Sequence, residues 1–260
     1  MWRMRDLMRR PPLLHVALDG GNGSTVVLIH GIASSSVTYE NLVPLIAGRH
    51  RVITIDLLGF GLSPAPTDAR YTIEEHVAAL RRTLRSLHVR GRMVLVGHSM
   101  GAIIATRYAA ENRRRLSRLV LVSPPVYFSP SEVGGSRDRT SMGLYYRAYE
   151  FLRGNKDFTM RAAAQLEKLS PIRNVLDISE RNWRPFVLSL ENTIETQTTL
   201  SDLVRITVPV HVIYGALDPF LAPAGVRIVS QLRGVKVHRV GSADHVIRPR
   251  LAQEIASAIG

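Results

Sequence analysis

The stretch Met93-Val94-Leu95-Val96-Gly97-His98-Ser99-Met100-Gly101 decides the fold class of this sequence. Its first four residues are apolar, as in a strand that is buried on both faces, and residues 101–112 continue in a helical pattern. Between them stands Gly-x-Ser-x-Gly, which places the serine in a sharp turn from strand to helix. A glycine two positions to either side lets strand and helix approach without a Cβ collision. The turn therefore predicts that the serine hydroxyl projects above the sheet, next to free N–H groups of a helix amino terminus.

Similar short apolar runs predict further strands of the same sheet. They cover residues 25–29, 52–55, 119–122, 208–214 and 235–240. Helical patterns separate them: Thr72-x-x-Glu75 is a capping box that opens a helix to about residue 88, and residues 249–259 form a last helix. Strands that alternate with helices predict the α/β class, with a mostly parallel, doubly wound central sheet flanked by helices.

The alternation stops between residues 126 and 200. This segment reads as a polar loop, 129–141, followed by helical segments, and it holds nine of the sixteen aromatic residues of the chain. We therefore predict a core domain made of residues 1–125 and 201–260, with residues 126–200 as a helical cap. Because aromatic side chains often line apolar pockets, we expect five of them to bind substrate. These are Tyr127, Tyr145, Tyr149, Trp183 and Phe186.

A serine hydroxyl needs a base and an acid that orients the base. Of nine histidines, His245 follows the last predicted strand and so lies at the carboxyl edge of the sheet, where such folds place their functional groups. Asp218 follows the next-to-last strand and is the predicted acid. Its rivals Asp202, Asp244 and Asp56 fit less well by position. The resulting order along the chain is Ser, Asp, His.

A second turn supplies the remaining part of this predicted site. His30-Gly31-Ile32-Ala33 ends a buried strand and precedes a helix that starts near Ser36. A backbone N–H of this turn, together with the N–H of Met100, can hold the oxyanion of a tetrahedral intermediate.

These features together resemble the α/β-hydrolase superfamily. The resemblance rests on His30-Gly31, on Asp56-x-x-Gly59-x-Gly61-x-Ser63, on the Gly97-x-Ser99-x-Gly101 turn, on Asp218 and on His245. It implies that the N–H groups of Ile32 and Met100 form the oxyanion hole, and that residues 126–200 occupy the position of the family's cap. A serine nucleophile in place of aspartate argues against the haloalkane dehalogenase and epoxide hydrolase branches.

The resemblance implies a serine hydrolase of carboxylic esters that acts on small to medium apolar or aromatic substrates through an acyl-enzyme. The same triad also serves lactonases, thioesterases and the carbon–carbon bond hydrolases of meta-cleavage products, and some members are slow small-molecule receptors. The carbon–carbon branch ranks second because His98 and Val246 stand where it commonly has Asn and Trp. The expected partner is a small-molecule ester, and we expect neither a metal nor another cofactor.

Composition limits the remaining classes. The absence of cysteine excludes a disulfide framework and a thiolate metal site, and no apolar run is long enough to span a membrane. The basic first ten residues lack a signal-peptide core, so we expect a cytoplasmic protein.

The net charge is +13, and ten arginines lie between Arg81 and Arg118. Such a basic surface can attract anionic lipid or nucleic acid, but no aromatic interleaving or nucleic-acid motif accompanies it, so we predict no nucleic-acid partner. The sequence makes no prediction of oligomeric state.

Overall fold

A single mixed sheet forms the centre of the computed structural model, which describes residues 10–127, 136–170, 172–173 and 175–260. Its strands are ordered β1-β3-β2-β4-β5-β6-β7, all parallel except β1, which pairs antiparallel with β3. Their bounds are β1 Val16–Gly20, β2 Ser24–Ile29, β3 His50–Ile55, β4 Met93–His98, β5 Leu116–Val122, β6 Val210–Gly215 and β7 Val235–Val240. The strand order reverses between β2 and β4, and ligands bind beyond the strand ends at such a switch point.

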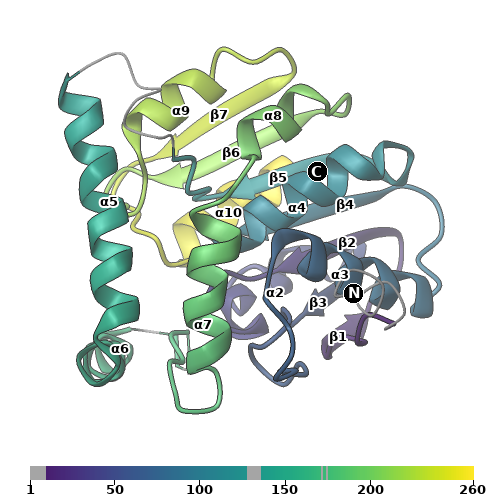
Figure 1. Cartoon of the computed structure of the whole chain (residues 1–260). Coiled ribbons are helices and arrows are strands. Elements are labelled where there is room, and N and C mark those ends of the chain that lie inside the picture. The colour runs from purple at the N-terminus through teal and green to yellow at the C-terminus, as the bar shows by residue number, and fades with distance from the viewer. Residues whose placement is uncertain (1–9, 128–135, 171, 174) are drawn as a thin grey trace, which may run out of the picture.

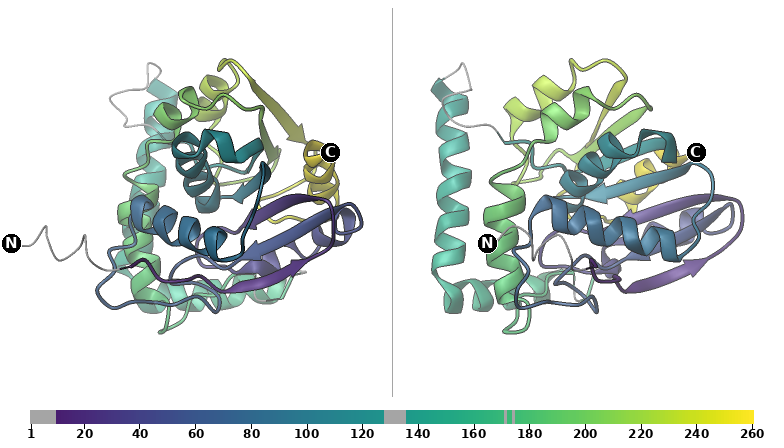
Figure 2. Two further views of the ribbon diagram at one scale, coloured as in Figure 1. Left: turned by 90° about the vertical axis from the view of Figure 1, so that its right-hand side faces the viewer. Right: turned by 45° about the vertical axis from the view of Figure 1, so that its right-hand side comes forward.

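Helices cover both faces of the sheet (Figures 1 and 2). The helices are α2 Val43–Ile46, α3 Ile73–Ser86, α4 Met100–Glu111, α5 Ser136–Gly154, α6 Lys156–Leu169, α7 Trp183–Ser189, α8 Thr199–Val204, α9 Pro223–Val229 and α10 Pro249–Ile259, with the short turns η1 Ser36–Tyr39, η2 Arg113–Arg115 and η3 Leu190–Ile194. On β2, Val27 and Ile29 pack into the cluster that contains α3 and α4, whereas Val26 and Leu28 pack into the cluster that contains α10. This alternation follows from the two-residue period of a strand and makes both faces apolar.

The α3 helix shows how local sequence fixes an element. The Thr72 hydroxyl accepts a hydrogen bond from the Glu75 N–H, and the Glu75 carboxylate accepts one from the Thr72 N–H, which is the predicted capping box. An N-cap of this kind stabilises a helix by about 1 kcal/mol. Val77, Leu80 and Leu84 are buried, so the apolar stripe holds the helix on the sheet.

The predicted α/β class and its doubly wound sheet are confirmed, with three local differences. The edge strand β1 has an apolar run of only three residues and alternates between half-buried and exposed residues, so its sequence signal is weak. Strand β6 begins at Val210 rather than at residue 208, because Pro209 has no N–H for the ladder. The prediction of a loop over 129–141 is wrong in its second half, where α5 begins at Ser136, and residues 128–135, including Phe128, lie outside the described residues.

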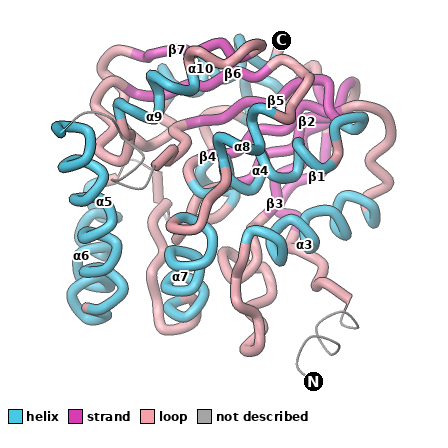
Figure 3. The backbone as a smooth tube through the Cα atoms, turned by 45° about the horizontal axis from the view of Figure 1, so that its top comes forward, coloured by secondary structure: helices cyan, strands magenta, loops and turns pink. Residues whose placement is uncertain are grey.

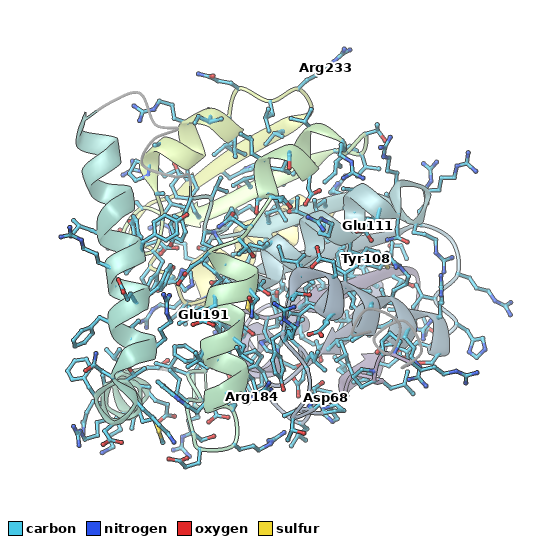
Figure 4. All side chains as sticks on the ribbon, in the orientation of Figure 1. Asp68, Tyr108, Glu111, Arg184, Glu191 and Arg233 are labelled. Atoms are coloured by element: carbon cyan, nitrogen blue, oxygen red, sulfur yellow. The ribbon has the colours of Figure 1, made fainter. Side chains whose placement is uncertain are left out.

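The described residues between β5 and β6 form helices joined by loops and contain no strand. The helices α5, α6 and α7 among them stand together beyond one side of the sheet (Figure 3). Arg153 of α5 forms ion pairs with Glu195 and with Glu191, which Figure 4 labels on the neighbouring α7–η3 ribbon, and these pairs tie α5 to that ribbon. The division into a core domain and a cap over 126–200 stays a prediction.

None of the helices in the described part of the chain combines the length and the hydropathy that a membrane span requires.

Candidate active site

Ser99 lies in a strained turn between β4 and α4. Its backbone has φ 53° and ψ −123°, a conformation that residues other than glycine rarely adopt. A Cβ at Gly101 would lie 2.3 Å from the His30 carbonyl oxygen, and one at Gly97 would lie 2.4 Å from the Gly101 carbonyl oxygen. Both glycines are therefore required by close backbone contacts. The contact at Gly97 is the expected one between strand and helix, whereas Gly101 is required by the end of β2.

Asp218 and His245 meet at the carboxyl edge of the sheet, as their positions after β6 and β7 predict. The His245 Nδ1–H donates to both carboxylate oxygens of Asp218, at 3.0 Å and 2.9 Å. The Asp218 carboxylate is fully buried, and it also accepts a hydrogen bond from the Phe220 N–H at 2.9 Å. This arrangement fixes the ring of His245 with Nε2 directed away from the carboxylate.

The electrostatics favour an ionised Asp218. Burial raises the pKa of this carboxyl group, but the hydrogen bond from His245, the charge of that imidazole and the Phe220 N–H together outweigh burial and lower the pKa below its usual value. A carboxylate that is ionised at neutral pH can stabilise a protonated imidazole beside it.

Ser99 and His245 line one cavity of about 450 Å³. In the described residues no hydrogen bond joins the Ser99 hydroxyl to the imidazole, although both side chains reach the same space. Such contacts are often long in the absence of substrate and tighten when substrate binds. The structure thus brings the three predicted triad residues to one site, with the Asp218–His245 pair already formed.

The second turn of the predicted site, His30-Gly31-Ile32-Ala33, is held rigidly. The His30 Nδ1–H donates to the Gly31 carbonyl at 2.7 Å, and Nε2 accepts from the Leu57 N–H at 2.9 Å. Burial lowers the pKa of His30 to about 4, so the ring is neutral and keeps both bonds. Asp56, which the sequence identified as part of a structural turn, accepts hydrogen bonds from Ser36 and other groups below this turn.

The predicted oxyanion donors lie on the two turns. Ile32 lines the cavity, and Met100 is the first residue of α4, directly after Ser99. Neither N–H donates to another protein group among the described residues, and of the two residues Ile32 is the one that lines the cavity. A helix amino terminus adds its positive dipole end at this point.

His98 connects the nucleophile turn to the base. Its Nε2–H donates to the backbone carbonyl of His245 at 2.9 Å, and the two rings lie 4.7 Å apart. Burial, with a smaller contribution from the nearby His245, lowers the pKa of His98 to about 3. A neutral His98 therefore tethers the loop that carries His245.

The five aromatic residues predicted to bind substrate have different places. Tyr149 and Phe186 line the cavity, whereas Tyr127, Tyr145 and Trp183 do not. Tyr127 donates to the Phe220 carbonyl and contacts the Tyr149 hydroxyl, and Tyr145 donates to the Leu221 carbonyl. Both tyrosines therefore support the loop after Asp218. Trp183 packs on Phe186 and lies beside Lys156.

Comparison with known proteins agrees with this architecture. The family described as "alpha/beta hydrolase fold" matches residues 24–247, which include all three triad candidates. The chain belongs to the α/β-hydrolase fold family. The resemblance drawn from the sequence motifs is therefore confirmed.

Several proteins similar to this chain carry the names of ester hydrolases. The chain is 25% identical over 252 residues to the pimeloyl-[acyl-carrier protein] methyl ester esterase of Aeromonas hydrophila subsp. hydrophila, covering 90% of this chain and 94% of that protein. It is 37% identical over 124 residues to the probable lysophospholipase BODYGUARD 1 of Arabidopsis thaliana, covering 46% of this chain and 26% of that protein. The chain thus spans about a quarter of the length of this plant relative. An esterase from Exiguobacterium antarcticum superposes with a TM-score of 0.77 at 18% identity, covering 95% of both chains, and shows the shared fold.

This α/β-hydrolase also carries site residues that sequence reasoning missed. Phe220 packs edge-on against His245 with ring centroids 4.9 Å apart, and Arg248 lines the cavity. The position of Phe220 two residues after Asp218 was a usable signal. No sequence signal identified the lining residues of α6, because α6 is far from Ser99 in the sequence and only the fold brings both to one cavity.

In the described part of this α/β-hydrolase, no group of three or more His, Asp or Glu side chains has the arrangement of a metal site.

Proposed function

We propose that this protein is a serine hydrolase that cleaves carboxylic esters of small molecules through an acyl-enzyme. One observation carries the proposal: the imidazole of His245 is bonded to a buried carboxylate and lines the same cavity as Ser99, which stands on a strained turn. The side chains of α5, α6 and α7 that line the same cavity support a cap role for residues 126–200.

The arrangement supports the following reaction. The Ser99 hydroxyl attacks the ester carbonyl carbon while His245 Nε2 takes its proton, and Asp218 stabilises the imidazolium. The N–H groups of Ile32 and Met100 donate to the oxyanion of the tetrahedral intermediate. The imidazolium then protonates the alkoxide as the carbon–oxygen bond breaks and the alcohol leaves. Water repeats these steps on the acyl-enzyme, releases the carboxylic acid and restores the serine.

Replacement of the nucleophile tests the proposal. Ser99→Ala should lower kcat for a nitrophenyl ester on the order of 10⁵-fold, and Asp218→Asn should lower it about 10⁴-fold, because the wrong tautomer of the base is then favoured. The far-ultraviolet circular dichroism of both variants should match that of the wild type. Turnover by Ser99→Ala within tenfold of the wild type would refute the assignment.

The same triad can open lactones, cleave thioesters or break carbon–carbon bonds next to a carbonyl, and a slow receptor would keep it too. A panel of these substrates separates the enzyme classes, and burst kinetics separate the receptor. A rapid acylation burst followed by negligible steady-state turnover would favour the receptor over the esterase.

A further inference from the structure

The cavity that Ser99 lines extends to helix α6. Its lining from the end of α5, from α6 and from residues 170–178, here called the α6 wall, consists of Leu152, Thr159, Ala162, Ala163, Leu166, Ser170, Val175, Leu176 and Ile178. Among the described lining residues, the Phe, Tyr and Trp side chains are Tyr149, Phe186 and Phe220, and Phe220 lies against His245. The described part of the α6 wall is therefore mostly apolar and contributes no aromatic ring of its own.

The two hydroxyl groups of the α6 wall, those of Thr159 and Ser170, already form hydrogen bonds within the protein. The Thr159 hydroxyl donates to the Leu152 carbonyl at 2.7 Å, and the Ser170 hydroxyl accepts from the Ile172 N–H at 3.2 Å. Of these two hydroxyl groups, only the Ser170 O–H keeps a proton that these bonds do not use. Most of the α6 wall therefore offers a polar ligand group no replacement for its hydrogen bonds to water, and that loss costs roughly 1–3 kcal/mol in proteins. The part of the cavity along the α6 wall therefore favours a ligand segment that has no polar atoms.

Charge points the same way. Among the lining residues that the structure describes there is no Asp or Glu, and Arg248 is the one with a permanent charge. Its guanidinium is paired with Asp244 at 2.9 Å. The lining thus shows no built site for an ionic group next to the α6 wall.

Small side chains on α6 leave the space open. Thr159, Ala162, Ala163 and Leu166 follow the three- and four-residue spacing of one helix face and all line the cavity, whereas Ala164 is exposed on another face. Ala163 is 4% exposed, so a larger side chain there would enter the cavity. The volume of about 450 Å³ has room for on the order of a dozen methylene-sized groups.

We propose that the acid part of the substrate is a medium-length aliphatic acyl chain, of roughly eight to twelve carbons, that lies along α6 with Ala163 limiting its length. This inference rests on the proposed function, since it assumes an ester whose carbonyl is attacked by Ser99.

A series of nitrophenyl esters from acetyl to myristoyl tests the proposal. In the wild type, kcat/KM should rise up to about fourfold for each added methylene, the transfer free energy of one buried methylene, and should level off near ten carbons. Ala163→Leu adds three carbon atoms to the wall, so its optimum should move to shorter chains by about three carbons. The ratio of its kcat/KM for the decanoyl ester to that for the butyryl ester should fall at least tenfold below the wild-type ratio. Ala164→Leu is the matched control and should keep the wild-type profile.

Binding of the products provides a readout that does not depend on turnover. Calorimetry should show that decanoate binds the Ser99→Ala protein at least tenfold more tightly than butyrate, and that adding Ala163→Leu removes most of this difference. If Ala163→Leu fails to fold, Ala163→Val offers a smaller step with the same direction.

The outcomes separate the two proposals. A chain-length profile that is flat in the wild type, or identical in Ala163→Leu and Ala164→Leu, overturns the acyl subsite while hydrolysis itself stands. Absence of hydrolysis for every ester, with decanoate still preferred over butyrate and this preference sensitive to Ala163→Leu, overturns the proposed function and keeps an aliphatic-chain site.

Discussion

The strained backbone of Ser99 predicts that removing this side chain altogether stabilises the protein. With φ 53° and ψ −123°, Ser99 occupies a region where a Cβ is disfavoured, and such a conformation costs about 1–3 kcal/mol. Ser99→Gly removes the Cβ and with it the strain, whereas Ser99→Ala keeps the Cβ. Both variants lose the nucleophile, so the comparison isolates the backbone.

The expected magnitude follows from two opposing effects. Glycine adds roughly 0.5–1 kcal/mol of conformational freedom to the unfolded chain. The strain at Ser99 belongs to the upper part of its range, because both dihedral angles lie outside the regions usual for a serine. Ser99→Gly should therefore exceed Ser99→Ala in free energy of unfolding by about 1–2 kcal/mol, or about 2–8 °C in Tm.

Urea denaturation followed by tryptophan fluorescence and circular dichroism measures the difference. The two variants should have equal m-values, so that a shift in midpoint reports stability alone. If Ser99→Gly proves equal to or less stable than Ser99→Ala, the turn holds no strain and the structural account of the nucleophile position fails.

Three further predictions follow from the site and its support. His98→Ala should lower kcat about tenfold with little change in KM, because the loop of His245 loses its tether, and His98→Gln should restore part of it by donating to the same carbonyl. A wild-type kcat in His98→Ala would remove the positioning role. Gly101→Ala should unfold the protein or destabilise it by more than about 3 kcal/mol in urea denaturation, since its Cβ would lie 2.3 Å from a carbonyl oxygen. Burial lowers the pKa values of His30, His76 and His98 to about 4, 3 and 3, so below pH 6.5 the unfolded chain binds more protons than the folded one. The free energy of unfolding should therefore fall between pH 6.5 and pH 4, by up to about 1.4 kcal/mol per pH unit for each histidine, and His76→Gln should reduce that slope by about one third. An unchanged slope in His76→Gln contradicts the neutral assignment of that ring.

The features that could be predicted from the sequence are those that depend on residues close to one another in the chain. The Gly97-x-Ser99-x-Gly101 turn, the Thr72–Glu75 capping box and the buried strands each occupy a short window, and each appears in the structure. The pairing of Asp218 with His245 was also accessible, since parallel strands bring the residues after β6 and β7 to the same edge.

The features that could not be predicted depend on contacts between distant segments. The hydrogen bond from His98 to the His245 carbonyl joins residues that are 147 positions apart, and no local sequence pattern predicts it. The place of each aromatic residue in 126–200 depends on how the helices turn: Tyr149 faces the cavity, while Tyr127 and Tyr145 face the loop after Asp218. Aromatic enrichment indicates a pocket but does not say which rings line it. Likewise, only the folded chain shows that the α6 wall of the cavity is mostly apolar.

The strand β1 marks a different limit. Its residues alternate between half-buried and exposed because it lies at the edge of the sheet. Its apolar run, Val16-Ala17-Leu18, has three residues and is shorter than the runs that predict the other strands, so periodicity does not mark it.

Covalent labelling tests whether Ser99 is the nucleophile of a triad completed by His245 and Asp218. The protein is treated with a nitrophenyl alkylphosphonate, and the adduct is located by mass spectrometry of tryptic peptides. We expect one phosphonyl group per chain on Ser99, loss of esterase activity in proportion to labelling, and labelling slowed at least a thousandfold in His245→Ala. Full inactivation with the label on another residue, or full labelling of Ser99 with activity retained, would contradict this assignment.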